Sequence, residues 1–124
     1  MKKTISALVA AGASVLLSSS AFAASSGGGQ WNGCDANYWA SNNTNTAAIA
    51  GGSNYLTGCS SIAVARVYRT SGGSVYRNQY VSDTTPTNGG FAAYATPTPA
   101  GTTYLRTQYR VCGRDQLCTE FSQA

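Results

Sequence analysis

TYLRTQYRVC, residues 103–112, carries the clearest strand pattern in the chain. Side chains here alternate in polarity with a period of two, which is typical of a strand that buries one face. The side expected to face the core holds Leu105, Thr107, Tyr109 and Val111. The side expected to face water holds Tyr104, Arg106, Gln108 and Arg110, because unpaired arginines are rarely buried.

Further strand-like segments lie on both sides of this one. Residues 62–69 and 74–81 are dense in β-branched and aromatic residues, and 91–95 and 117–121 are shorter candidates. Turn residues separate these segments at intervals near ten residues, and no helical period follows residue 24. The sequence therefore predicts an all-β protein, a small antiparallel β-sandwich that is immunoglobulin-like or related.

The sequence SGGS, residues 71–74, predicts a tight hairpin turn between two of these strands. A turn centred on the two glycines sets Tyr68 opposite Arg77 and Arg66 opposite Gln79. A turn shifted by one residue would oppose Arg66 and Arg77, and opposed like charges disfavour that register.

The favoured register assigns the two faces of the hairpin. The face expected in the core holds Ala63, Ala65, Val67, Tyr76 and Tyr80. The face expected in water holds Arg66, Tyr68, Arg77 and Gln79, with Ile62, Val64 and Val81 toward its end.

Residues 1–23 are interpreted as a secretory signal peptide. Lys2 and Lys3 precede an apolar run, and Ala21-Phe22-Ala23 fits the small-x-small pattern of a cleavage site. Residues 24–30, ASSGGGQ, are expected to form a flexible lead, and residues 31–124 a single domain. The apolar run of this segment is too short to span a bilayer, and the mature chain holds no second run of that length. We therefore expect a secreted protein, extracellular or periplasmic.

Four cysteines, all in the mature chain, predict two disulfides in an exported domain of this size. We favour Cys112–Cys118, which closes a predicted hairpin, and Cys34–Cys59, which holds a region poor in apolar residues. The alternative joins Cys59 to Cys112 and Cys34 to Cys118, as a tie between two sheets.

Charge and composition exclude several function classes. Without Lys2 and Lys3, six arginines and four acids leave a net charge of +2, too small for a nucleic-acid binder. The chain has no histidine, so the usual general base and the usual transition-metal ligand are missing. We therefore expect a non-enzyme without cofactor or metal. Asp35, Asp83 and Asp115 are interpreted as turn caps rather than as calcium ligands.

Two groups of residues are candidates for a binding surface. The first is rich in Arg, Tyr and Gln, which suits anionic groups and sugars, although such residues are also ordinary on a solvated sheet. Its members are Arg66, Tyr68, Arg77, Gln79, Tyr104, Arg106, Gln108 and Arg110. The second is an aromatic group that could bind a ligand or pack over one end of the sandwich. Its members are Trp31, Tyr38, Trp39 and Tyr55.

Two short segments resemble known families. Residues 99–111, PAGTTYLRTQYRV, resemble the penultimate strand of immunoglobulin-like and fibronectin-type sandwiches, which implies the same fold class. Residues 27–31, GGGQW, are similar to the start of secreted lactococcin-type bacteriocins, small β-sandwiches aimed at the cell envelope. The remainder of that family's pattern, its histidines included, is absent from this chain, so we assign no family.

We expect a secreted, non-enzymatic binding module acting at or outside the bacterial cell envelope, on an envelope or extracellular protein or polymer. The alternative is a secreted antagonist, either a bacteriocin-like toxin or an inhibitor of an extracellular hydrolase. An inhibitor would present the loop 113–117 inside Cys112–Cys118. A third hypothesis is a subunit of a surface fibre.

Overall fold

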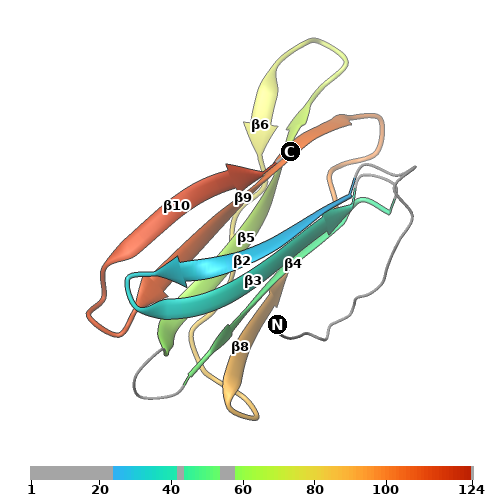
Figure 1. Ribbon diagram of the computed structural model, residues 1–124. Coiled ribbons are helices and arrows are strands. Elements are labelled where there is room, and N and C mark those ends of the chain that lie inside the picture. Colours follow the sequence, from blue (N-terminus) through green and yellow to red (C-terminus); the bar gives the residue numbers. More distant parts are fainter. Residues whose placement is uncertain (1–23, 42–43, 54–57, 124) are drawn as a thin grey trace.

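The computed structural model describes residues 24–41, 44–53 and 58–123, which form strands and no helix (Figure 1). The segment expected to be a signal peptide, residues 1–23, lies outside the described residues. The first strands are β2 (Ala24–Trp31), β3 (Cys34–Ser41), β4 (Thr46–Gly52) and β5 (Cys59–Arg69). They are followed by β6 (Val75–Arg77), β7 (Val81–Asp83), β8 (Gly90–Tyr94), β9 (Thr103–Gly113) and β10 (Cys118–Gln123).

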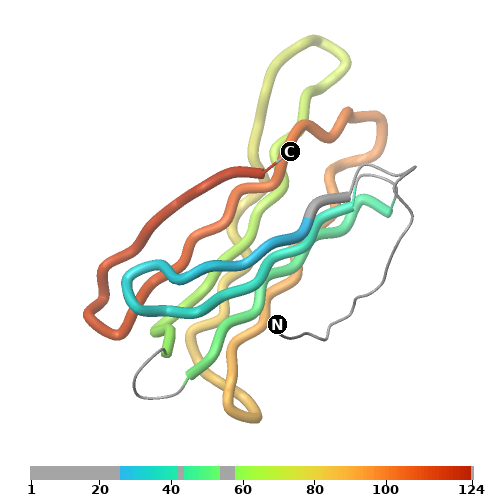
Figure 2. The backbone as a smooth tube through the Cα atoms, in the orientation of Figure 1, coloured from blue at the N-terminus to red at the C-terminus, as the bar shows by residue number. Residues whose placement is uncertain are grey.

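These strands form two antiparallel sheets packed face to face (Figures 1 and 2). The first sheet has the order β2-β3-β4-β8. The second has the order β10-β9-β5-β6, and β7 also pairs with β5. The predicted fold class, a small disulfide-bonded antiparallel β-sandwich, is confirmed.

The core lies between the sheets and is asymmetric in side-chain size. The first sheet contributes mostly small residues, among them Ala36, Ala40 and Ala47, while the second contributes larger ones. Tyr109, fully buried, is the largest apolar side chain of this core. Its ring lies 4.9 Å from that of Tyr38 and 5.3 Å from that of Phe121, so one aromatic cluster joins the two sheets.

The predicted alternation of residues 103–112 is confirmed for most of β9. Thr107, Tyr109 and Val111 are fully buried, and Arg106 is exposed. The exception is Leu105, expected in the core. A register shift against β5 at Val67/Tyr68 leaves Leu105 between the paired residues Arg106 and Tyr104, as in a β-bulge. The extra residue turns Tyr104 toward the interior instead of water.

The predicted register of the β5–β6 hairpin is wrong by one residue. Tyr68 lies opposite Tyr76, and Val67 opposite Arg77. The turn has three residues instead of two, closed by a hydrogen bond from the Thr70 amide to the carbonyl oxygen of Ser74 (2.9 Å). Gly73 takes the left-handed position with φ of 91°, which a three-residue loop requires of its last residue.

The predicted assignment of the faces of β5 is wrong as well. Ile62, Val64 and Arg66 face the core, and Ala63, Ala65 and Val67 lie on the outer face of the sheet, although all are buried. The outer three pair with the long residues Arg110, Gln108 and Arg106. Because the three are short, the longer neighbours shield them from water.

Residues 24–30, expected to be a flexible lead, form strand β2 with Trp31. The glycines have a packing role there. Gly27 lies opposite Tyr38, and a Cβ atom at Gly27 would lie 2.5 Å from the tyrosine hydroxyl. A Cβ atom at Gly29 would lie 3.2 Å from the Trp31 indole. Aromatic rings therefore lie close against the bare backbone of β2, and a side chain at Gly27 would require the Tyr38 ring to move.

Both favoured disulfides are confirmed, Cys34–Cys59 and Cys112–Cys118. Cys34 begins β3 and Cys59 begins β5, so this bond links the two sheets covalently. Cys112 and Cys118 are directly opposed residues of β9 and β10. Both cysteines of the Cys34–Cys59 bond are buried, whereas Cys118 of the second bond is exposed.

Loop closure predicts different contributions from the two disulfides. Replacing Cys34 and Cys59 by Ala should lower the free energy of unfolding by about 3.5 kcal/mol, because that bond closes the longer loop. Replacing Cys112 and Cys118 by Ala should lower it by about 2.4 kcal/mol. Urea denaturation at pH 7 measures both values, and the reverse order would contradict this ranking.

Burial of Tyr109 predicts a loss of stability in alkali. Burial raises the pKa of Tyr109 above its usual 10.0, helped by nearby Tyr104 and Tyr38, so the folded state keeps a proton that the unfolded state releases. The free energy of unfolding should therefore be unaffected by this group below pH 10. Above pH 10 it should fall by about 1.4 kcal/mol per pH unit.

The variant Tyr109→Phe isolates this effect. Its urea stability should decline less steeply between pH 10 and 11.5 than that of the parent protein. Tyr94→Phe, at a side chain that is 70% exposed, is the matched control and should leave the profile unchanged. Equal slopes for Tyr109→Phe and the parent would contradict the assignment.

Candidate binding surface

The structure separates the predicted binding residues into four places. Arg77, Arg106, Gln108 and Arg110 lie on the outer face of the second sheet, as the pairing of β5, β6 and β9 shows. Gln79 is exposed just beyond β6. Arg66 and Tyr68 lie on the opposite, inward side of β5, contrary to the prediction. Trp31 and Trp39 lie on the first sheet.

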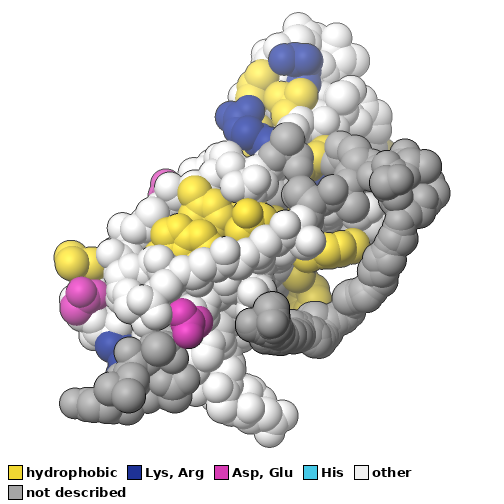
Figure 3. Space-filling model, in the orientation of Figure 1, with side chains coloured by type: hydrophobic (Ala, Val, Ile, Leu, Met, Phe, Trp, Pro, Cys, Tyr) yellow, Lys and Arg dark blue, Asp and Glu magenta, His cyan; other side chains and the backbone are white. Residues whose placement is uncertain are grey.

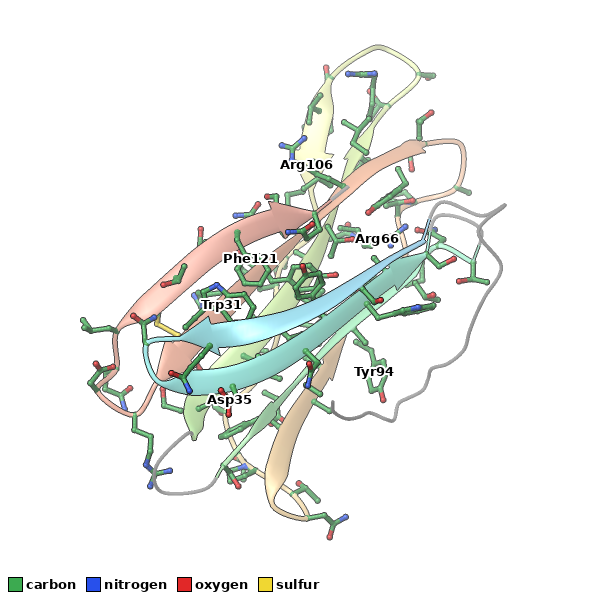
Figure 4. All side chains as sticks on the ribbon, in the orientation of Figure 1. Trp31, Asp35, Arg66, Tyr94, Arg106 and Phe121 are labelled. Carbon is green, nitrogen blue, oxygen red and sulfur yellow. A yellow bond between two sulfur atoms is a disulfide. The ribbon has the colours of Figure 1, made fainter. Side chains whose placement is uncertain are left out.

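Arg66 is the largest fully buried side chain of the described residues. Its Nη1 donates to the carbonyl oxygen of Thr46 (2.8 Å), and its Nη2 donates to that of Ser41 (3.4 Å). Its guanidinium carbon lies 3.5 Å from the centroid of the Tyr104 ring. Arg66 therefore joins the second sheet to the end of β3 and the start of β4 (Figure 4).

The surroundings of Arg66 explain how a cation is held in the core. No ion pair to Arg66 is found among the described residues, and its Nε has no hydrogen-bond partner there. Burial lowers the pKa of the guanidinium, but arginine is so strongly basic that the group remains charged at neutral pH. Two carbonyl oxygens and the face of a tyrosine replace the water that the cation has lost.

The hairpin formed by the end of β5 and by β6 projects beyond the sandwich (Figure 1). Its base is fixed by Asn78. The Asn78 amide donates to the carbonyl oxygen of Arg66 (3.0 Å), and its side chain donates to those of Thr96 (3.0 Å) and Pro97 (3.2 Å). The Tyr68 and Tyr76 rings, 6.0 Å apart, pack across the two strands.

Arginine side chains gather at this projecting end, which we call the arginine hairpin and define by Arg69, Arg77 and the adjacent Arg106. All three are exposed. Arg77 and Arg106 both pair with Val67 from opposite sides, so their Cα atoms are about 10 Å apart. Figure 3 shows basic side chains on the projecting hairpin and acidic ones on the body.

The positions of the charged residues can be compared along strand β5, with which their strands pair. The arginine hairpin is level with Val67 and Arg69. Asp83 pairs with Ile62, five residues or about 17 Å from Val67 along the strand. Glu120 pairs with Arg110, which is level with Ala63, about 13 Å from Val67.

The other two acids lie farther still. Asp35 follows Cys34, which is bonded to Cys59 at the start of β5, and Asp115 lies beyond Gly113, which pairs with Cys59. All four acids therefore lie in the half of the molecule away from the arginine hairpin, as the labels of Asp35 and Arg106 show in Figure 4. Arg110 and Arg114 belong to that acidic half.

Several side chains of the outer face contact one another. The Gln108 side chain donates to Glu120 (3.2 Å). Arg77 and Arg110 lie 4.3 and 5.3 Å from the Tyr80 ring. Burial, and next the charge of Glu120, raise the pKa of Tyr80. Tyr80, predicted in the core, instead lies among the arginines of this outer face.

The two tryptophans do not form one cluster. Trp31 faces inward, where its ring stacks on Phe121 at 4.5 Å and lies 6.5 Å from Tyr38. Trp39 lies on the outer face, because β3 alternates and Tyr38 beside it faces the core. Tyr55 lies outside the described residues.

The outer face around Trp39 consists largely of small residues. Ala48 lies between Trp39 and Tyr94 in the register, and the neighbouring row holds Asn37, Ala50 and Ala92. Tyr94 points away from the sandwich (Figure 4) and is 70% exposed.

Asp83 and Asp115 act as turn caps, as predicted, whereas the same prediction is wrong for Asp35, which lies in β3. Asp83 accepts hydrogen bonds from the amides of Thr85 (3.2 Å) and Ala92 (2.9 Å), and Asp115 from that of Leu117 (3.0 Å). Asp35 accepts a bond from the Gln30 side chain (2.9 Å). No group of three or more potential metal ligands occurs in the described part of the chain.

Comparison with family models, with curated proteins and with solved structures gives no match to this chain. The candidate surface therefore depends on the geometry alone. Sequence reasoning missed Arg69, Val75 and Tyr76, which the projection of the hairpin exposes. The signal available for Val75 and Tyr76 was that two large apolar residues directly follow a glycine turn.

Truncation of Arg66 should destabilise the whole domain. Arg66→Ala removes the donor of the Thr46 carbonyl oxygen, leaves the carbonyl oxygen of the buried Ser41 without its donor and opens a cavity beside Tyr104. We expect a loss of about 2–4 kcal/mol in the free energy of unfolding. Arg69→Ala, three residues along the same strand but exposed, should cost less than about 0.5 kcal/mol. Urea denaturation compares the two, and equal losses would show that Arg66 has no special role.

Proposed function

We propose that this chain is an exported, non-enzymatic binding module that acts at or outside a bacterial cell envelope and binds anionic groups through the arginine hairpin. The observation that carries the proposal is the separation of charge. Three exposed arginines lie together, and every acidic side chain lies in the opposite half.

Screening by salt weakens the effect of the distant acids on the charge of the arginine hairpin. The Debye length at physiological ionic strength is about 8 Å, and the backbone of the nearest acidic residue is about 13 Å along the sheet from the backbone of Arg77 and Arg106. The acids therefore offset only part of the positive field of the arginine hairpin. Guanidinium groups form forked hydrogen bonds with carboxylate, phosphate and sulfate, which envelope polymers display.

The disulfides support an extracytoplasmic role. Cys34–Cys59 and Cys112–Cys118 suggest an oxidising environment, extracellular or periplasmic. They fit the proposal of a secreted module, for which the signal peptide expected at residues 1–23 would provide the export. The described residues contain no helix that is long and apolar enough to cross a membrane.

A charge-matched pair of variants tests the proposal. Arg69→Gln with Arg77→Gln removes two charges from the arginine hairpin. Arg110→Gln with Arg114→Gln removes two from the acidic half. The oxidised chain from residue 24 should bind inorganic polyphosphate and isolated cell envelopes, more weakly at higher salt. The first double variant should lose at least tenfold in affinity, and the second less than threefold.

The outcomes of this test are distinct. Equal losses in the two double variants would show a general effect of net charge and contradict a localised site. Retained folding is checked by urea denaturation, since Arg69 and Arg77 are exposed and should contribute little stability.

One observation favours the alternative of a secreted antagonist. Leu117 is 61% exposed within the loop that Cys112–Cys118 closes, where an inhibitor would present it. The loop is a tight turn, with Gln116 at φ 69°, whereas a substrate-like segment in a protease cleft is extended. Inhibition of growth or of a panel of proteases by the oxidised chain, abolished in Leu117→Ser, would favour this alternative.

A further inference from the structure

We infer that the anionic partner of the arginine hairpin is a lipid bilayer, on which the hairpin docks with its turn first. This inference rests on the proposed function and names its partner. Val75 is 48% exposed and Tyr76 is 53% exposed, and both lie on the same short strand as Arg77. A soluble polyanion would be bound by the arginines alone and leaves these apolar groups unexplained.

The register places the apolar Val75 deeper than the cationic Arg77 when the turn enters a bilayer first. Val75 lies two residues nearer the turn than Arg77, about 7 Å along the strand. Interfacial segments bury their apolar groups about 5–10 Å into the boundary between headgroups and acyl chains. With Val75 at that depth, Arg77 lies at the level of the lipid phosphates. Arg69, opposite Val75, can extend its side chain back toward the phosphates.

The side chains on both faces of the hairpin suit docking on a bilayer with the turn first. Val75 shares one side with Arg69 and Arg77, and Tyr76 shares the other with Tyr68, because neighbouring residues of a strand alternate. Tyrosine favours the membrane interface, where its ring contacts apolar chains and its hydroxyl remains hydrated. The turn itself, residues 71–74, is exposed, small and uncharged, so it brings no ionic group into the headgroup layer.

Charge complementarity favours this partner and this approach. A bilayer rich in anionic lipid attracts the arginine hairpin, and the four acids lie in the half that would point away from it. Each basic residue near such a surface strengthens binding about fivefold. The contribution disappears with salt, whereas that of Val75 and Tyr76 does not.

Vesicle sedimentation with the oxidised chain from residue 24 tests the inference. Vesicles of phosphatidylcholine with 30% phosphatidylglycerol should bind the protein, and vesicles of phosphatidylcholine alone should bind it at least tenfold more weakly. Arg69→Gln with Arg77→Gln should weaken binding to the anionic vesicles about 25-fold, fivefold for each arginine.

The apolar contribution has its own variants. Val75→Thr with Tyr76→Thr places a β-branched residue, which favours a strand, at both positions and removes the apolar groups. This double variant should bind anionic vesicles at least tenfold more weakly and inorganic polyphosphate as well as the parent does. Leu117→Ser, at an exposed apolar residue of the acidic half, is the control and should alter neither affinity.

Each outcome decides between the two proposals. Binding to polyphosphate without binding to anionic vesicles overturns the bilayer as partner and leaves the proposed function. Absence of binding to both overturns the two together. Vesicle binding that the Val75 and Tyr76 variant retains in full shows adsorption by charge alone and overturns docking by the turn. Urea denaturation of each variant confirms that the domain remains folded.

Discussion

A buried guanidinium holds the two sheets together at the end of the sandwich that carries the projecting hairpin. Arg66 gives its donors to the carbonyl oxygens of Ser41 and Thr46, which belong to the opposite sheet, and its π face to Tyr104. Its own carbonyl oxygen accepts the Asn78 amide, where the hairpin returns to the body. The other end is closed by the Cys34–Cys59 bond. One polar and one covalent link therefore fix the sheets relative to each other, and the hairpin is built on the polar one.

The role of Arg66 also explains where prediction from the sequence succeeded and where it failed. The alternation of residues 103–112 and the spacing of the cysteines are local signals, and they gave the strand β9, the fold class and both disulfides correctly. The expectation that arginine faces water misplaced Arg66. Because side chains alternate with a period of two, that one error exchanged the two faces of β5. The acceptors that make its burial possible lie 20 and 25 residues earlier in the chain, in segments without any local mark.

The remaining errors have similar causes. The glycines of β2 have the composition of a linker, and only the rings of Tyr38 and Trp31 against them show that they belong to a sheet. The bulge at Leu105 and the three-residue hairpin turn each shift a register by one residue. The candidate site depends on these registers, because they decide which arginines lie together and which acids lie away from them. The composition shows only a small net charge, whereas the fold separates one group of positive side chains from the four negative ones.

The pairing of β5 with β9 has a consequence for how the domain forms. Arg69 pairs with Thr103 and Cys59 with Gly113, so the two central strands of one sheet are joined across 34 to 54 positions of the chain. Contacts of such long range require large loops to close before any stabilising interaction is gained, which is why all-β domains fold in milliseconds to seconds rather than microseconds. Until β9 arrives, Ile62 and Val64 have no partner strand on that side. Completion of the second sheet therefore depends on β9 and β10, the last strands of the chain to be reached, whereas all the strands of the first sheet precede them.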